Sequence, residues 1–219
     1  AYGAVNLFPL MKDDEFREEM TRVTGINPCS AEDLTKGEIA CRRQILEVMD
    51  WLHKNYKGTE NIRLTKIANM MGMMVSRRIV AEYKVTTDDI LNYKMFDDVI
   101  SMNAYGVDIH NPDGGGCELY WLIPGHAYSI PYRALLPMGV ENIIAAGRCI
   151  AHEGIAVMST CYGTGEAAGA AAALSIKENV ELRKLSIDKL QDALRKQGVY
   201  LGEAEPEKPE PRYIHIKTL

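Results

Sequence analysis

Two histidines in this chain of 219 residues have neighbours that suit proton transfer. His110 ends the alternating segment Val107-Asp108-Ile109-His110, so Asp108 lies on the same face of an expected strand. An imidazole titrates near neutral pH, which makes His110 a candidate general acid or base that Asp108 could support. His152 is the second candidate, and the adjacent Glu153 is a weaker one. The alternative for His110 is a satisfied polar group at the end of a strand.

The stretch from Glu141 to Ile176 has the pattern of a strand, glycine turns and a helix of small residues. A buried-strand pattern over residues 142–146 ends at Gly147-Arg148, and Gly163-Thr164-Gly165 opens an alanine-rich segment. We expect a helix that begins near these glycines. Glycines permit close approach of a ligand, and a helix N-terminus offers free N–H groups and positive dipole character. The same small residues also suit close packing against a sheet, and both interpretations can hold together.

Cationic and phenolic side chains provide candidate contacts for a carboxylate or a polyhydroxylated substrate, because guanidinium groups bind carboxylates through a planar fork. Successive residues of a strand point to opposite faces, so at most one of Arg77 and Arg78 faces a given site. The candidates for substrate binding are Arg78, Tyr132 and Arg133.

An ordered series of sequence blocks, covering about residues 20–200, resembles the FAD-dependent oxidoreductases of the glutathione-reductase-like flavoprotein superfamily. In that family a last Rossmann strand precedes a helix whose N-terminus points at the isoalloxazine ring. The resemblance implies FAD as cofactor and hydride transfer from a small polar substrate, with His110 or His152 in the catalytic role. The blocks are Ser76-Arg77-Arg78-Ile79 with Glu82-Tyr83, Phe96-Asp97-Asp98, Val107-Asp108-Ile109-His110 and Ile130-Pro131-Tyr132-Arg133, and the implied cofactor-binding residues are Gly147, Arg148, Gly163, Thr164 and Gly165.

The sequence departs from that family in three places. It contains no GxGxxG, the motif that holds the FAD pyrophosphate after the first strand. Met74-Val75 and Ala156 stand where relatives show Arg-Glu and an arginine, which could alter substrate choice or signal reduced activity. The chain therefore resembles the C-terminal half of a flavoprotein, as a fragment or as one subunit of a split enzyme.

We expect two partners, a small-molecule substrate and a second polypeptide or N-terminal half that carries GxGxxG, together forming an oligomer. A non-catalytic scaffold or binding subunit is the alternative. Such a scaffold would not need His110 or the turn Gly163–Gly165, so these residues favour the enzyme.

The fold class that we expect is α/β. Residues 1–125 would form an α+β substrate-side or cap region, residues 126–200 the last strand and helix of a Rossmann-like FAD-binding fold, and residues 201–219 a linker with a docking strand. Capping residues and apolar spacing predict helices over about 31–56, from Thr86 or Thr87 to about Val99, and between Ser186 and Gly198. The other expected elements are strands over 78–85, 142–146 and 213–217, an extended segment over 130–137, a loop over 111–116 and an extended linker over 203–211.

Composition narrows the classes of protein. A net charge of −5 with scattered lysines and arginines argues against a nucleic-acid partner. No apolar run approaches the length of a membrane span, and the N-terminus does not have the pattern of a signal peptide. The five cysteines (Cys29, Cys41, Cys117, Cys149 and Cys161) form no CxxC and leave an odd thiol, which favours the cytoplasm and no metal site.

Overall fold

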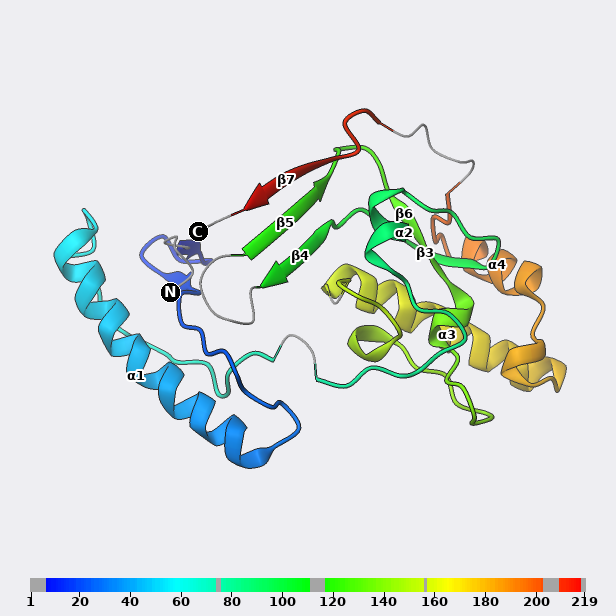
Figure 1. Ribbon diagram of the computed structural model, residues 1–219, viewed down its shortest axis with the longest axis horizontal. Coiled ribbons are helices and arrows are strands. Elements are labelled where there is room, and N and C mark those ends of the chain that lie inside the picture. Colours follow the sequence, from blue (N-terminus) through cyan, green and yellow to red (C-terminus); the bar gives the residue numbers. More distant parts are fainter. Residues whose placement is uncertain (1–6, 74–75, 111–116, 156, 203–208, 218–219) are drawn as a thin grey trace. The chain divides into compact units, whose positions relative to one another are not determined.

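The computed structural model describes residues 7–73, 76–110, 117–155, 157–202 and 209–217, with the side chains of residues 109, 110, 117 and 217 left aside (Figure 1). The chain has two compact units whose main division lies between Ser76 and Arg77. Helices and small antiparallel sheets make the fold a mixed α and β one. The predicted functional division at residue 125 stays a prediction.

The first unit consists of a hairpin and a long helix. β1 (Leu7–Pro9) and β2 (Phe16–Glu18) are antiparallel, with Leu7 opposite Glu18. α1 (Ala31–Asn55) confirms the predicted helix. It begins after Ser30, whose Oγ caps the helix by accepting a hydrogen bond of 3.3 Å from the N–H of Asp33. Thr59 Oγ1 donates to the carbonyl of Leu52 at 2.8 Å and closes the last turn.

The second unit is built on the antiparallel pair β3 (Val99–Asn103) and β6 (Tyr128–Pro131), against which α3 (Met158–Glu178) packs (Figure 1). α4 (Ile187–Lys196) contacts both α3 and β3, and Ser186 caps it as predicted. Short elements complete the unit: α2 (Thr87–Leu91) and the 3-10 helices η1 (Tyr132–Leu135), η2 (Gly147–Cys149) and η3 (Leu182–Lys184). Its core is made of fully buried aliphatic side chains, which include Ile100, Ile130, Leu135, Ile150, Leu190 and Leu194.

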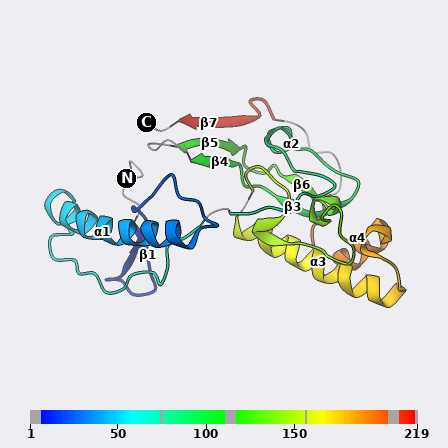
Figure 2. The same ribbon diagram turned by 60° about the horizontal axis from the view of Figure 1, so that its bottom comes forward.

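A second sheet has the order β4 (Val107–His110), β5 (Cys117–Leu122) and β7 (Tyr213–Lys217), and both views show the three strands side by side (Figures 1 and 2). β7 is the predicted docking strand, and it docks on the chain's own sheet. The His215 ring stacks on Tyr120 with centroids 4.4 Å apart. Tyr93 secures the start of β7, because its hydroxyl donates to the carbonyl of Arg212 at 2.6 Å and accepts from the N–H of Ile123 at 3.0 Å.

Two predicted strands are wrong. Residues 142–146 form no ladder among the described residues: Asn142 has a φ of +56°, and Ala145 donates to the carbonyl of Leu135 at 2.9 Å. With the described parts of the chain, residues 78–85 make only isolated bridges, from Ala81 to Pro137 and from Val85 to His152. A strand needs a continuous hydrogen-bonded neighbour, which an apolar pattern does not supply.

Three other predictions are corrected in their limits. The helix after Thr86 ends at Leu91 rather than near Val99, because Tyr93 has a φ of +52° that no α-helix continues. Within the extended segment 130–137, Tyr132 begins a 3-10 turn. The alanine-rich helix begins at Met158, so Gly163–Gly165 lie in its second turn and not at its start. The predicted loop over 111–116 and residues 203–208 of the linker lie outside the described residues.

Candidate functional site

The structure brings Gly147 onto the first turns of α3, while the prediction that the two belong to one ligand site stays a prediction. The N–H of Gly147 donates a hydrogen bond of 3.0 Å to Thr164 Oγ1. Gly147 has a φ of +77°, which favours glycine, and an added Cβ would lie 3.8 Å from the Cβ of Cys161. The Gly147-Arg148 turn therefore packs directly on the beginning of α3.

The three residues Gly163, Thr164 and Gly165 differ in what surrounds them. Thr164 is fully buried and donates its hydroxyl hydrogen to the carbonyl of Thr160 at 2.7 Å, so it joins the turn to the helix. At Gly163 an added Cβ would lie 2.2 Å from Ser101 Oγ on β3. At Gly165 an added Cβ would meet nothing within 4 Å. Of the three, only Gly165 presents its surface outward.

The N-terminus of α3 has no side-chain cap, because Val157 occupies the N-cap position. The N-caps of α1, α2 and α4 are instead Ser30, Thr86 and Ser186, each of which accepts a bond from its own first turn. First-turn N–H groups have no partner within a helix. At α3 they are therefore left for groups other than a cap, such as the oxygens of a ligand.

His152 is buried, and both of its ring nitrogens meet the backbone of its own loop. The N–H of Ile155 donates to Nδ1 at 3.1 Å, so Nε2 carries the hydrogen and donates to the carbonyl of Arg148, also at 3.1 Å. Burial lowers the pKa of His152, the charge of Arg78 lowers it further, and the Arg148 carbonyl opposes both. The ring is held neutral and fixes the loop that carries Arg148.

His110 ends β4, and its side chain lies outside the described part of the structure. The structure therefore describes no distance from the His110 imidazole to α3. Asp108 on the same strand accepts a hydrogen bond of 3.4 Å from the hydroxyl of Tyr105. The catalytic role of His110 stays a prediction, as does that of His152.

The predicted substrate contacts differ in exposure and in their partners within the chain. Arg78 is exposed, as is Arg148 among the cofactor contacts. The hydroxyl of Tyr132 is buried and donates to the carbonyl of Leu182 at 3.0 Å, and burial raises its pKa to about 12. Arg133 pairs with the carboxylate of Asp98 at 3.1 Å. The guanidinium of Arg133 also lies 5.0 Å from the centre of the Tyr83 ring.

Two groups of polar residues were not predicted from the sequence. Lys94 Nζ donates to Tyr83 Oη at 2.8 Å and to Asp89 Oδ1 at 2.7 Å. In the second group, Asn103 on β3 donates to Tyr128 Oη at 2.9 Å and to Thr160 Oγ1. Asn103 and Thr160 are 57 residues apart and carry no motif, so no local signal could have paired them.

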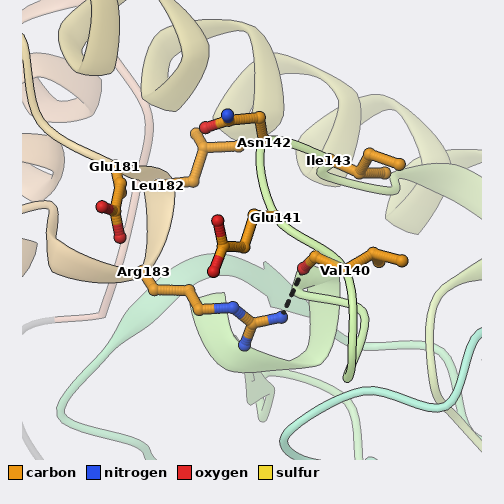
Figure 3. Close-up of a pocket in the computed structure, with 7 residues that line it drawn as sticks. All are labelled: Val140, Glu141, Asn142, Ile143, Glu181, Leu182 and Arg183. Carbon is orange, nitrogen blue, oxygen red and sulfur yellow. Dashed lines mark hydrogen bonds between the residues drawn. The ribbon is translucent and has the colours of Figure 1, made fainter.

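A small hollow lies beside the turn that leads into residues 142–146 (Figure 3). Arg183 donates to the carbonyl of Val140 at 3.1 Å, as the dashed line shows, and also to the carbonyl of Pro137. Its guanidinium pairs with Glu82 as well, so it serves to hold the turn. The hollow is lined by Val140, Glu141, Asn142, Ile143, Glu181, Leu182 and Arg183, and it contains none of the predicted site residues.

Among the described residues, no three His, Cys, Asp or Glu side chains are grouped in a way that could hold a metal ion. In that same part of the chain, no helix combines the length and the hydropathy needed to cross a membrane.

Comparison with known protein families identifies the family of this chain. The sequence pattern of the family described as FAD dependent oxidoreductase matches residues 3–194, which is most of the chain. Searches of curated proteins and of solved structures gave no significant match.

Proposed function

Because the chain belongs to the FAD-dependent oxidoreductase family, we propose that it supplies the flavin and substrate side of an enzyme that takes a hydride from a small polar substrate. The cofactor of the family is FAD. The observation that carries the proposal is the joining of the Gly147-Arg148 turn to the uncapped N-terminus of α3 through the buried Thr164.

The residues at this surface fit a flavin. Gly165 presents backbone without a Cβ toward open space, which lets a planar ring approach, and Gly147 adopts the left-handed conformation that favours glycine. Arg148 is exposed, and its planar guanidinium is of a type that suits ring oxygens. The first-turn N–H groups of α3 favour the negative charge of a reduced ring, an effect worth about 0.3–2 kcal/mol. Bound FAD supplies the hydride acceptor.

Proton transfer from the substrate needs a group that can change its charge near neutral pH. We assign this role first to His110, which ends a strand of the second sheet. His152 is the second choice, because it would have to break a bond to Ile155 or to Arg148 before it could exchange a proton with a substrate. Arg78, Tyr132 and Arg133 remain the proposed substrate contacts, and Arg78 is the most accessible of the three.

We further propose that residues 142–146, which form no ladder with the described residues of this chain, become the last strand of a Rossmann-like fold beside α3 when a neighbouring strand is supplied. A polypeptide or chain segment that carries GxGxxG would complete it. Gly165 and Gly169 support this, because an added Cβ at either would meet nothing within 4 Å. Glycine inside a helix costs about 1 kcal/mol relative to alanine. The large exposed side chains Met158, Tyr162 and Ile176 lie on the same side of α3, as expected for a face that another element covers.

A cytoplasmic location agrees with the state of the described cysteines. Cys29, Cys41, Cys149 and Cys161 are free thiols, as a reducing compartment requires.

The second candidate function is a scaffold without flavin chemistry. The observation in its favour is that the side chains of His152, Tyr132 and Arg133 all form hydrogen bonds or ion pairs within the chain. It differs from the first candidate in requiring no FAD at Gly147.

An absorption spectrum of the protein isolated from its source, with intact-mass analysis of every chain present, tests the proposal. Flavin bands together with a polypeptide bearing GxGxxG are expected. An Arg148→Ala variant should then bind FAD more weakly, whereas Arg42→Ala, in the first unit, should not. A colourless chain that stays folded and takes up no added FAD would reject the enzyme and leave the scaffold.

A further inference from the structure

A continuous path of hydrogen bonds runs through the interior of the second unit and ends at the candidate flavin surface. Asn103 donates to Tyr128 Oη and to Thr160 Oγ1, and its own Oδ1 accepts from the N–H of Tyr105 at 3.0 Å. The carbonyl of Thr160 accepts from Thr164, which in turn accepts from the N–H of Gly147. Three elements, β6, β3 and α3, are thereby connected to one turn.

The members of this path are almost completely buried. The exposed fractions are 0% for Tyr128, 5% for Asn103, 2% for Thr160 and 0% for Thr164. Burial raises the pKa of Tyr128, with the bond from Asn103 opposing it, so the phenol stays neutral. Apolar side chains of similar shape would fill the same space but would let α3 slide along β3. Directional hydrogen bonds instead fix the position of α3 on β3.

The place where the path meets α3 is the helix start. Thr160 lies in the first turn, where Val157 provides no side-chain cap. The bond from Asn103 therefore holds the first turn from the inside without occupying its N–H groups. A cap would have held the same turn by bonding those N–H groups itself.

We propose that Asn103 and Thr160 are positioning residues for the flavin, acting through the first turn of α3 and the Gly147 turn. This inference rests on the function proposed above. Asn103 does not touch the ligand. It sets the direction in which the first-turn N–H groups point, and these groups stabilise the reduced ring only when they are aligned with it.

The test is the isosteric change Thr160→Val, which removes the hydroxyl that accepts from Asn103 and keeps the shape. Thr164→Val removes the last link to Gly147, and Thr160→Ser keeps the hydroxyl and serves as the rescue. Thr59→Val is the matched control, because Thr59 is a buried threonine of the first unit whose hydroxyl also bonds the backbone. The dissociation constant for FAD, the flavin midpoint potential and the melting temperature are measured for each variant in the protein as isolated.

We expect Thr160→Val and Thr164→Val to bind FAD about threefold to tenfold more weakly, the factor that one lost hydrogen bond gives. Their midpoint potentials should become more negative, because the reduced ring loses stabilisation. Thr160→Ser should keep the wild-type potential, and Thr59→Val should lower only the melting temperature.

Two results overturn the inference, and they are distinguishable. If the wild type binds FAD and both valine variants keep its affinity and potential, the path is only structural and the proposed function stands. If the wild type takes up no FAD, the proposed function fails, and the inference fails with it.

Discussion

The helix α3 contains three glycines that should respond in opposite ways to the same substitution. Gly163, Gly165 and Gly169 all lie inside the helix, where alanine is preferred by about 1 kcal/mol at each position. They differ only in their surroundings. An added Cβ at Gly163 would lie 2.2 Å from Ser101 Oγ and 3.1 Å from Ser101 Cβ, whereas at Gly165 and Gly169 it would meet nothing within 4 Å.

The expected magnitudes follow from these contacts. Ser101 is buried on β3, so it cannot move aside easily, and overpacking of this kind costs about 1–3 kcal/mol. Gly163→Ala should therefore lose up to about 2 kcal/mol after the helix gain is subtracted. Gly165→Ala and Gly169→Ala should each gain about 1 kcal/mol.

Urea unfolding of the protein as isolated from its source, followed by circular dichroism, measures these differences, and the FAD affinity of the same preparation is measured in parallel. We expect Gly165→Ala to stabilise the chain and yet to weaken FAD or partner binding, because the open space is kept for another molecule. Unfolding data in which Gly163→Ala is as stable as Gly165→Ala would refute the packing argument. If Gly165→Ala stabilises the chain and leaves the affinities for FAD and for the partner unchanged, neither molecule contacts α3 at Gly165.

The C-terminal strand and the buried histidine give the remaining predictions. Tyr93→Phe removes the hydroxyl that bridges Arg212 and Ile123, which costs about 1–2 kcal/mol, so trypsin should cleave after Arg212 about 5–30 times faster. Tyr132→Phe loses a similar buried bond away from β7 and should leave that rate unchanged, and equal rates in both variants would contradict the role of Tyr93. Because the folded pKa of His152 is lowered from 6.5, protonation favours the unfolded chain, and stability should fall as pH drops below 6.5 toward the folded pKa. Urea unfolding measured from about pH 7 to about pH 5, on both sides of the ordinary histidine pKa, should show a flatter profile for His152→Gln, and parallel profiles would count against this linkage. Lys94→Met should destabilise the chain by about 1–3 kcal/mol, because it leaves the buried Asp89 carboxylate without its cation, and Lys189→Met, at an exposed pair with Glu178, should cost under about 1 kcal/mol.

The sequence predicted those elements that are marked by capping residues or by alternating apolar residues. The capping residues Ser30 and Ser186 begin α1 and α4 as predicted, and Gly198, with a φ of +90°, follows the end of α4. The alternating segment 213–217 formed a strand that docks, as expected. These signals act over one helical turn or one strand, so they are visible without the rest of the fold.

The ligand site itself stays a prediction, but the proximity of two of its predicted parts can be compared with the structure. The sequence joined Gly147 to Gly163–Gly165 as one ligand surface, and the bond from Gly147 to Thr164 agrees with that grouping. It could not show that Thr164 faces inward while Gly165 faces outward. That distinction depends on which side of α3 packs on β3. Because small residues lie on both sides of the helix, the sequence does not indicate which side is buried.

The sequence by itself determined the caps, the small-residue helix and the family to which the chain belongs. The tertiary structure decided where α3 begins: the helix starts at Met158, and Thr160 in its first turn accepts a hydrogen bond from Asn103 on β3. It also decided that residues 142–146 form no ladder here, since a strand depends on hydrogen bonds from a neighbour that may lie anywhere in the sequence. Caps are interactions between residues that are close in sequence, whereas helix limits and sheet pairing at this site depend on partners far away in the chain.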